Sequence, residues 1–309
     1  MVEDSKLKSY KSFGLQFNSR IYFPELEEVE LTTNPDVTIE VSDLTNLWKQ
    51  EGNEGKFVIK QGRVLFKIED TGVFCIEEGE RVIVSPLEKR NVDKMRLYIL
   101  GSCMGAILLQ RKILALHGSA IAINGKAYAI VGDSGAGKST LAASFIANGY
   151  KILSDDVIPV SLSNQIPIVT PSYPQQKLWS RSLEKFGMDK KEFNPLFERE
   201  DKYAIPVNKH FFKDALPLGG IIELSKRECD QVELSSIRSL QAIYTLYNHT
   251  YRNFFVPRLG LMEWHFKITS QISGQVPCYH IVRPISQFTA GEIRDLILSK
   301  IKKGEKLHA

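Results

Sequence analysis

The sequence has few cysteines and no long apolar run. Its four cysteines, Cys75, Cys103, Cys229 and Cys278, lie far apart and form no CxxC pair. We therefore expect reduced thiols rather than a zinc site or a disulfide framework. The N-terminus lacks the apolar core of a secretion signal, and the longest apolar stretch, residues 97–110, is shorter than the roughly 20 residues of a membrane span. These absences predict a cytoplasmic protein with no membrane partner.

An excess of charge of one sign is also missing. The 40 lysines and arginines nearly balance the 36 aspartates and glutamates, which leaves a net charge of +4. So mild a balance does not favour nucleic acid as a partner, although it suits an anionic ligand. The chain has 309 residues, of which 43% are hydrophobic, so it is long enough for one large domain or two modest ones.

The chain changes character near residue 95. Residues 1–95 contain short β-branched runs separated by turn residues and carry no catalytic motif, so we expect a β-rich N-terminal region. Residues 93–116 have the length and spacing of a helix. Further on, Asn124-Gly125 between two apolar runs predicts a hairpin, and strands then alternate with helices. We expect an α/β (α+β) domain over residues 96–309.

A phosphate-binding motif stands at the start of this second region. The segment consists of Gly132, Asp133, Ser134, Gly135, Ala136, Gly137, Lys138 and Ser139, followed by Thr140, and it matches GxxxxGK[ST]. An apolar strand precedes it and a helix follows, which is the context that the motif requires. Backbone N–H groups and the helix N-terminus bind phosphates, Lys138 reaches the terminal phosphates and Ser139 binds Mg²⁺. No guanine-reading NKxD motif follows, so we expect ATP.

Two adjacent acids follow soon after the loop. Asp155 and Asp156 lie 17 and 18 residues after Lys138, at the expected end of the next strand. Neighbouring strand residues point to opposite faces, so both carboxylates reach one site only where the backbone turns. Phosphoryl transfer needs one group that holds the metal and one that positions the acceptor hydroxyl. The residues alone leave open which of the two aspartates takes which role. His117, just before the loop strands, is a third catalytic candidate.

Residues 117–160 resemble the kinase domain of HPr kinase/phosphorylase. In that family a strand with a histidine precedes the phosphate loop, and two aspartates follow on the next strand. The family is related in fold to phosphoenolpyruvate carboxykinase, so the resemblance implies a P-loop kinase core with a mixed sheet. It implies ATP and Mg²⁺, with Mn²⁺ as an alternative, and places His117 near the transferred phosphate or the acceptor. It also implies that the aspartate pair supplies the base and a metal ligand. We favour Asp155 as the base and Asp156 as a metal ligand beside Ser139, and leave the division open. It leaves a homo-oligomer open.

A narrower resemblance concerns the acceptor. Residues 10–28, 173–179 and 216–226 are similar to HPr-kinase-like proteins encoded with lasso-peptide biosynthesis genes, some of which phosphorylate the C-terminal serine of a precursor peptide. This resemblance implies a serine hydroxyl of a peptide or small protein as the acceptor. The glycine- and arginine-bearing loop that HPr kinases use in phosphorolysis is missing from residues 185–205. The first 95 residues also differ from the HPr kinase N-terminal domain, so we expect neither phosphorolysis nor HPr as a substrate.

Residues that bind the acceptor carry a weaker signal. The candidates are Lys177, Trp179 and Arg181, which alternate after the acids, together with Lys202, Arg252 and Arg258. Basic and aromatic residues on extended backbone suit a peptide with a carboxylate. A solvated edge strand, a Lys202–Glu200 ion pair and paired surface arginines are the alternatives. Two other functions also stay open, namely a nucleotide-binding regulatory protein without transferase activity and a small-molecule kinase.

Overall fold

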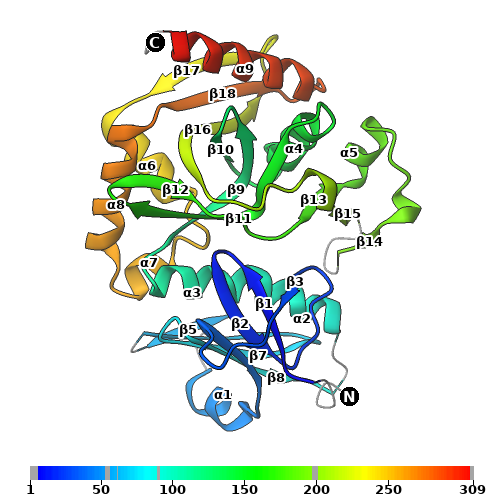
Figure 1. The fold of residues 1–309 in the computed structure, drawn as a ribbon, viewed down its shortest axis with the longest axis vertical. Coiled ribbons are helices and arrows are strands. Elements are labelled where there is room, and N and C mark those ends of the chain that lie inside the picture. Colours follow the sequence, from blue (N-terminus) through cyan, green and yellow to red (C-terminus); the bar gives the residue numbers. More distant parts are fainter. Residues whose placement is uncertain (1–5, 53–55, 61, 89–90, 197–200, 307–309) are drawn as a thin grey trace.

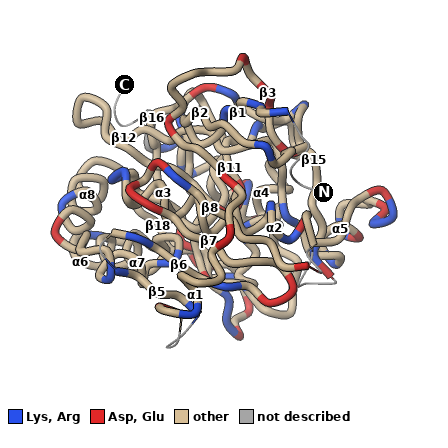
Figure 2. The backbone as a smooth tube through the Cα atoms, turned by 90° about the horizontal axis from the view of Figure 1, so that it is seen from below, with Lys and Arg blue, Asp and Glu red and all other residues tan. Residues whose placement is uncertain are grey.

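The computed structural model describes residues 6–52, 56–60, 62–88, 91–196 and 201–306. In Figure 1 a smaller N-terminal sheet lies below a larger C-terminal part, and a row of helices runs between them. Within these residues no helix is both long and apolar enough to cross a membrane. Lys and Arg are interspersed with Asp and Glu along the backbone, for example around α5 (Ser180–Lys185), as the small net charge requires (Figure 2).

The predicted β-rich N-terminal region is an eight-stranded mixed sheet of order β3-β1-β2-β4-β8-β7-β6-β5. Its strands are β1 (Lys8–Ser12), β2 (Leu15–Ser19), β3 (Glu27–Val29), β4 (Val37–Val41), β5 (Phe57–Lys60), β6 (Arg63–Ile68), β7 (Gly72–Glu77) and β8 (Arg81–Pro86), with helix α1 (Thr45–Glu51) after β4. Alternating apolar residues on one face form a core in which Phe17, Phe66 and Phe74 are fully buried.

A helical segment lies between this sheet and the rest of the chain. It consists of α2 (Val92–Tyr98), the π-helical turn η1 (Ile99–Cys103) and α3 (Met104–Gln110). The helix predicted over residues 93–116 is too long at its C-terminal end, because Lys112 adopts a positive φ of 56° and a strand begins at Leu114. The segment packs into the same core as the N-terminal sheet. The expected division at residue 95 therefore falls inside α2, and packing joins this helix to the N-terminal region.

The C-terminal part is built around a mixed seven-stranded sheet of order β10-β9-β11-β12-β16-β18-β17. An additional β10–β16 pairing closes five of these strands into a ring. The strands are β9 (Leu114–Ile123), β10 (Lys126–Val131), β11 (Lys151–Ser163), β12 (Ile166–Val169), β16 (Leu216–Arg227), β17 (Glu233–Ile237) and β18 (Cys278–Pro284). The predicted hairpin joins β9 and β10, with positive φ at both Asn124 and Gly125.

Helices and a small sheet surround this ring. The helices are α4 (Lys138–Ile146) after the phosphate loop, α5, α6 (Ser239–Asn248), α7 (Phe255–Arg258), α8 (Met262–Gln275) and α9 (Ala290–Lys306), with short 3₁₀ turns at Lys190–Glu192 and Asn208–His210. A three-stranded sheet has the order β13 (Gln175–Trp179), β15 (Lys202–Pro206), β14 (Asn194–Pro195). Mixed sheets with packed helices confirm the predicted α/β class.

Candidate active site

The phosphate motif forms the turn between β10 and α4. Gly132 has a φ of 147°, and a Cβ there would lie 2.2 Å from the carbonyl oxygen of Leu224 on β16, so only glycine fits. The Lys138 ammonium donates hydrogen bonds to the carbonyls of Gly132 at 2.7 Å and Asp133 at 3.0 Å. Burial lowers the pKa of Lys138, while Asp155 and Asp156 oppose that shift. The segment therefore has the curled backbone and the lysine of a phosphate cradle.

Arg283, a residue that the sequence did not single out, supports this loop. It lies on β18, and its Nε donates to the carbonyl oxygen of Ala136 at 2.7 Å. A Cβ on Gly137 would approach that Nε to 3.2 Å, so the loop and the guanidinium are in close contact. Burial lowers the pKa of Arg283. Its position 147 residues after Ala136 leaves no local pattern by which a sequence could reveal the pairing.

Asp155 is held against the phosphate loop. Its Oδ1 accepts hydrogen bonds from the Ser119 hydroxyl at 2.5 Å and from the Ser139 hydroxyl at 3.2 Å, and its Oδ2 accepts from the backbone N–H of Lys177 at 2.8 Å. The carboxylate is buried. The residue beside Ser139 is thus Asp155, whereas we had favoured Asp156 as its partner in metal binding.

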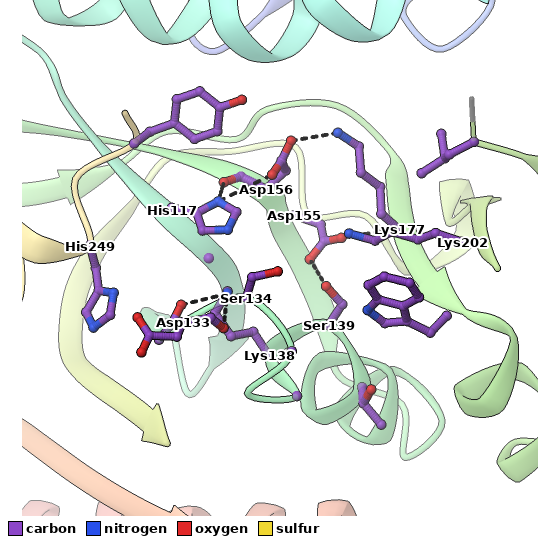
Figure 3. Close-up of a pocket in the computed structure, with 18 of the residues that line it drawn as sticks. His117, Asp133, Ser134, Lys138, Ser139, Asp155, Asp156, Lys177, Lys202 and His249 are labelled. Atoms are coloured by element: carbon purple, nitrogen blue, oxygen red, sulfur yellow. Dashed lines mark hydrogen bonds and ion pairs between the residues drawn. The ribbon is translucent and has the colours of Figure 1, made fainter. Parts of the chain in front are cut away.

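Asp156 has different neighbours. Its Oδ2 lies 2.6 Å from the Lys177 ammonium, and its Oδ1 lies 3.3 Å from Nδ1 of His117. Burial alone raises the pKa of Asp156, but Lys177 and His117 outweigh it and hold the pKa well below its usual range. Lys177 is buried as well, and the attraction of Asp156 raises its pKa in spite of burial. Figure 3 shows the two carboxylates pointing to different partners in one pocket.

The two acids reach one pocket for a reason other than the one we expected. They lie in the middle of β11, not at a strand end. A register shift between Ile152 and Ser154 precedes them, and Asp156 has a positive φ of 84°. Such a φ is rare for a residue other than glycine, and it breaks the alternation of side chains that a regular strand imposes. The expectation of a strand end was wrong, because a distortion inside the strand directs both carboxylates into one pocket.

His117 lies beside Asp156 on the neighbouring strand β9. Its Nδ1 is 3.0 Å from the carbonyl oxygen of Asp156 and faces the carboxylate as well. Since both neighbours accept hydrogen bonds, Nδ1 carries the proton. The ring also makes an edge contact with Tyr251, at 5.7 Å between centroids.

These groups line one pocket of about 740 Å³. The pocket brings together His117, Asp133, Lys138, Ser139, Thr140, Asp155 and Asp156 with the acceptor candidates Lys177, Trp179, Arg181, Lys202 and Arg252. Arg258 is exposed, stacks on Phe254 and is not part of the lining. Lys202 lies 5.7 Å from the Trp179 ring, and the expected alternative partner, Glu200, lies outside the described residues.

The pocket also has lining residues that sequence reasoning missed. Leu97, Tyr98 and Ser102 come from the helical segment of the N-terminal region, and Tyr251 follows α6. The helical spacing of Tyr244, Tyr247 and Tyr251 predicts core packing, but Tyr244 is exposed and Tyr251 lines the pocket. The spacing could not show that the helix ends at Asn248 and that the chain then turns toward β9, where Thr250 bridges Leu116.

A second pocket of about 350 Å³ adjoins the first beyond α4. The two share Gly137, Thr140, Arg181, Ser182 and Arg283. The second pocket is lined by the partly exposed side chains of Ile285 and Phe288 and by Thr289, whose buried hydroxyl has no hydrogen-bond partner among the described residues. An orphaned buried hydroxyl beside exposed apolar groups is typical of a ligand site.

Comparisons with known proteins identify a relative for part of the chain. No family model matches it. A stretch of 70 residues is 37% identical to the HPr kinase/phosphorylase of Mycoplasmopsis pulmonis (strain UAB CTIP) and covers 22% of this chain and 23% of that protein. The match thus spans about a quarter of the curated relative. The HPr(Ser) kinase/phosphatase from Coxiella burnetii has a TM-score of 0.37 and 14% identity over 63% of this chain and 94% of that one. The sequence match confirms the resemblance to HPr kinase/phosphorylase for this segment.

Proposed function

We propose that this protein is an ATP- and Mg²⁺-dependent kinase that transfers the γ-phosphate to a serine hydroxyl of a peptide or small protein. The observation that carries the proposal is the arrangement of two carboxylates in the phosphate-loop pocket. Asp155 is bonded to Ser139 of the loop, while Asp156 lies beside Lys177 and His117. One acid thus serves the nucleotide side and the other serves the acceptor side.

The nucleotide side suits a magnesium ion. The Ser139 hydroxyl and the Asp155 carboxylate are neighbouring oxygen atoms. Mg²⁺ prefers oxygen ligands, and in nucleotide sites it is commonly held by one or two protein oxygens together with phosphate oxygens. No cluster of three His, Cys, Asp or Glu side chains suited to a metal occurs among the described residues, which agrees with a site that the phosphates complete. When bound, the ion neutralises charge on the phosphate oxygens. We therefore assign Asp155 and Ser139 to the metal.

The second pocket supports a place for the nucleoside. Its lining includes Thr140, which follows the loop lysine and serine, but neither Asp155 nor Asp156. Phe288 offers an aromatic face for a base, and the Thr289 hydroxyl is free to bond a polar edge. The nucleotide would run from the second pocket, across the loop, to the two aspartates.

The acceptor side supports activation of a hydroxyl. As the acceptor oxygen forms its bond to phosphorus, the bond to the ADP oxygen breaks and the hydroxyl proton passes to Asp156. A carboxylate with a depressed pKa is a weak base, but in a loose transition state it mainly orients the hydroxyl and takes the proton late. Lys177 and Lys138 neutralise the negative charge on either side of the transferred group.

The acceptor itself follows from the resemblance. We propose the C-terminal serine of a lasso-precursor peptide, with serine hydroxyls of other peptides or small proteins as less favoured acceptors. The test is incubation with ATP, Mg²⁺ and the peptide encoded beside the gene, followed by mass spectrometry. A mass gain of one or more phosphates is expected. ATP binding without transfer to any neighbouring candidate would contradict the peptide version and favour a nucleotide-dependent regulatory protein.

A further inference from the structure

Arg252 is a pocket arginine that has no acidic partner among the described residues. It follows α6, adopts a positive φ of 49° and lines the first pocket but not the second. Its Nε and Nη2 donate to one hydroxyl oxygen, that of Ser102, at 3.0 Å and 2.7 Å. In the part of the chain that the structure describes, no carboxylate pairs with it. A partly buried guanidinium that is hydrogen-bonded only to a neutral hydroxyl still lacks the anionic partner that a guanidinium favours.

The guanidinium is held in a fixed plane. Its central carbon lies 5.0 Å from the ring centroid of Phe57 and 5.8 Å from that of Tyr251. Stacking on aromatic faces orients the fork of donors, and that fork matches a planar carboxylate. Phe57 belongs to the N-terminal sheet and Ser102 to the π-helical turn, so the N-terminal region provides the support for Arg252. π-helical turns occur often at functional sites.

Tyr251 connects this arginine with the catalytic acid. The Tyr251 hydroxyl bonds with Ser102, and burial, followed by the charge of Asp156, raises the pKa of Tyr251 to about 12. The phenol therefore stays protonated and can donate. A Cβ built on Gly101 would lie 2.9 Å from the Tyr251 hydroxyl and 3.9 Å from Oδ2 of Asp156, so the phenol and the acid flank one small space.

The helical segment also fixes the Tyr251 ring. A Cβ on Gly105 would lie 2.6 Å from that ring, so Gly101 and Gly105, four residues apart on one helix face, together form the groove in which Tyr251 sits. The N-terminal region therefore positions the acceptor side of the pocket, although it contains no catalytic motif of its own.

We infer that Arg252, supported by Ser102 and Phe57, binds a carboxylate of the acceptor while Tyr251 and Asp156 face its hydroxyl. This inference rests on the proposed kinase function and names its substrate class: an acceptor with a carboxylate close to the hydroxyl that is phosphorylated. A C-terminal serine has both groups on neighbouring carbon atoms, so both enter one pocket. An internal serine has an amide in that place and leaves Arg252 without its anion.

The experiment compares two randomised tripeptide pools that end in serine, one with a free carboxylate and one with a C-terminal amide. Wild-type protein, Arg252→Gln and the matched control Arg258→Gln are each incubated with ATP and Mg²⁺. ATP affinity and melting temperature are measured first, to show that each variant is folded. The wild type and Arg258→Gln should phosphorylate the carboxylate pool at least tenfold faster than the amide pool. Arg252→Gln should reduce transfer to the carboxylate pool to the rate for the amide pool, with unchanged ATP affinity.

Other outcomes overturn the inference. Equal rates for both pools with wild-type protein would exclude a terminal carboxylate as the recognised group. No transfer to either pool despite ATP binding would contradict the proposed transferase function, on which the inference rests. If Arg252→Gln lowered transfer to both pools and ATP hydrolysis alike, Arg252 would serve the transferred phosphate instead. Failure of the wild type to bind ATP would contradict the proposed kinase function itself, which keeps the two claims separate.

Discussion

The two ends of the pocket differ in how the chain builds them. At the nucleotide end, the phosphate loop is one continuous segment, residues 132–140, whose three glycines all have positive φ and where a Cβ on Gly132 would clash with Leu224. The acceptor end combines Ser102, His117, Asp156, Lys177 and Tyr251, which come from different elements and meet only in the folded protein. In the proposed kinase, phosphate binding would therefore depend on local backbone geometry, whereas acceptor selection would depend on the packing of the N-terminal region against the C-terminal part.

The largest expected effect on the rate of transfer comes from a substitution at the nucleotide end. Lys138→Met should lower phosphate transfer on the order of a thousandfold, because it removes a charged donor at the point where negative charge develops. Lys151→Met, an exposed lysine at the start of β11, is the matched control and should leave the rate unchanged. The check is steady-state kinetics with the accepted peptide. A Lys138→Met rate within tenfold of wild type would remove Lys138 from the phosphate site.

At the acceptor end, removing the lysine that pairs with Asp156 should lower stability as well as activity. Lys177→Met leaves the partly buried Asp156 without its ammonium partner, which should lower the free energy of unfolding by about 3 kcal/mol. Because Asp156→Asn removes the stranded charge, the double variant should be more stable than Lys177→Met alone. Urea denaturation at neutral pH measures all three variants. Strictly additive losses would mean that the two side chains do not interact.

The pH dependence of the same pair has a defined sign. The pKa of Asp156 is depressed, so its contribution to stability is present above about pH 4, the unfolded value, and is lost as pH falls through the folded pKa. The pKa of Lys177 is raised, so its contribution is present below about pH 10 and is lost at still higher pH. The stability of the wild type relative to the double variant should thus be level between these limits and fall at lower pH.

A smaller effect, on binding affinity, distinguishes the contribution of the nucleoside from that of the phosphates. Phe288→Ala should weaken ATP binding about tenfold through lost stacking, while the affinity for inorganic tripolyphosphate should not change. Phe266→Ala, an exposed phenylalanine of α8, is the control. Calorimetric titration with both ligands gives the comparison. Equal loss for ATP and tripolyphosphate would place the nucleoside elsewhere.

This contrast also explains what could be predicted from the sequence. The phosphate loop with its following helix and the hairpin at Asn124-Gly125 are encoded locally, and the structure contains each of them. The strand end at the two aspartates was wrong, because the positive φ of Asp156 has no local signature. The helix expected over residues 93–116 ends at Gln110, and its π-helical turn could not be foreseen from apolar spacing.

Contacts between residues far apart in the sequence could not be predicted, because they form only when the chain folds. Lys177 was expected to face an acceptor, but it is buried against Asp156 on the adjacent element. Arg283 reaches the phosphate loop from β18, and Ser102 reaches Arg252 from a region without any catalytic motif. Only Gly101 and Gly105, four residues apart in an apolar helix, offered a sequence signal, because such spacing indicates close approach of another group.

The most direct test of this account compares Asp155→Asn with Asp156→Asn. Binding of Mg²⁺ with ATP and transfer to the peptide are measured for both variants. We expect Asp155→Asn to lose the Mg²⁺-dependent part of ATP binding, and Asp156→Asn to keep it while transfer falls at least a hundredfold. The opposite pattern, in which Asp156→Asn loses metal dependence and Asp155→Asn retains it, would contradict the assignment of the two acids to the two ends of the pocket.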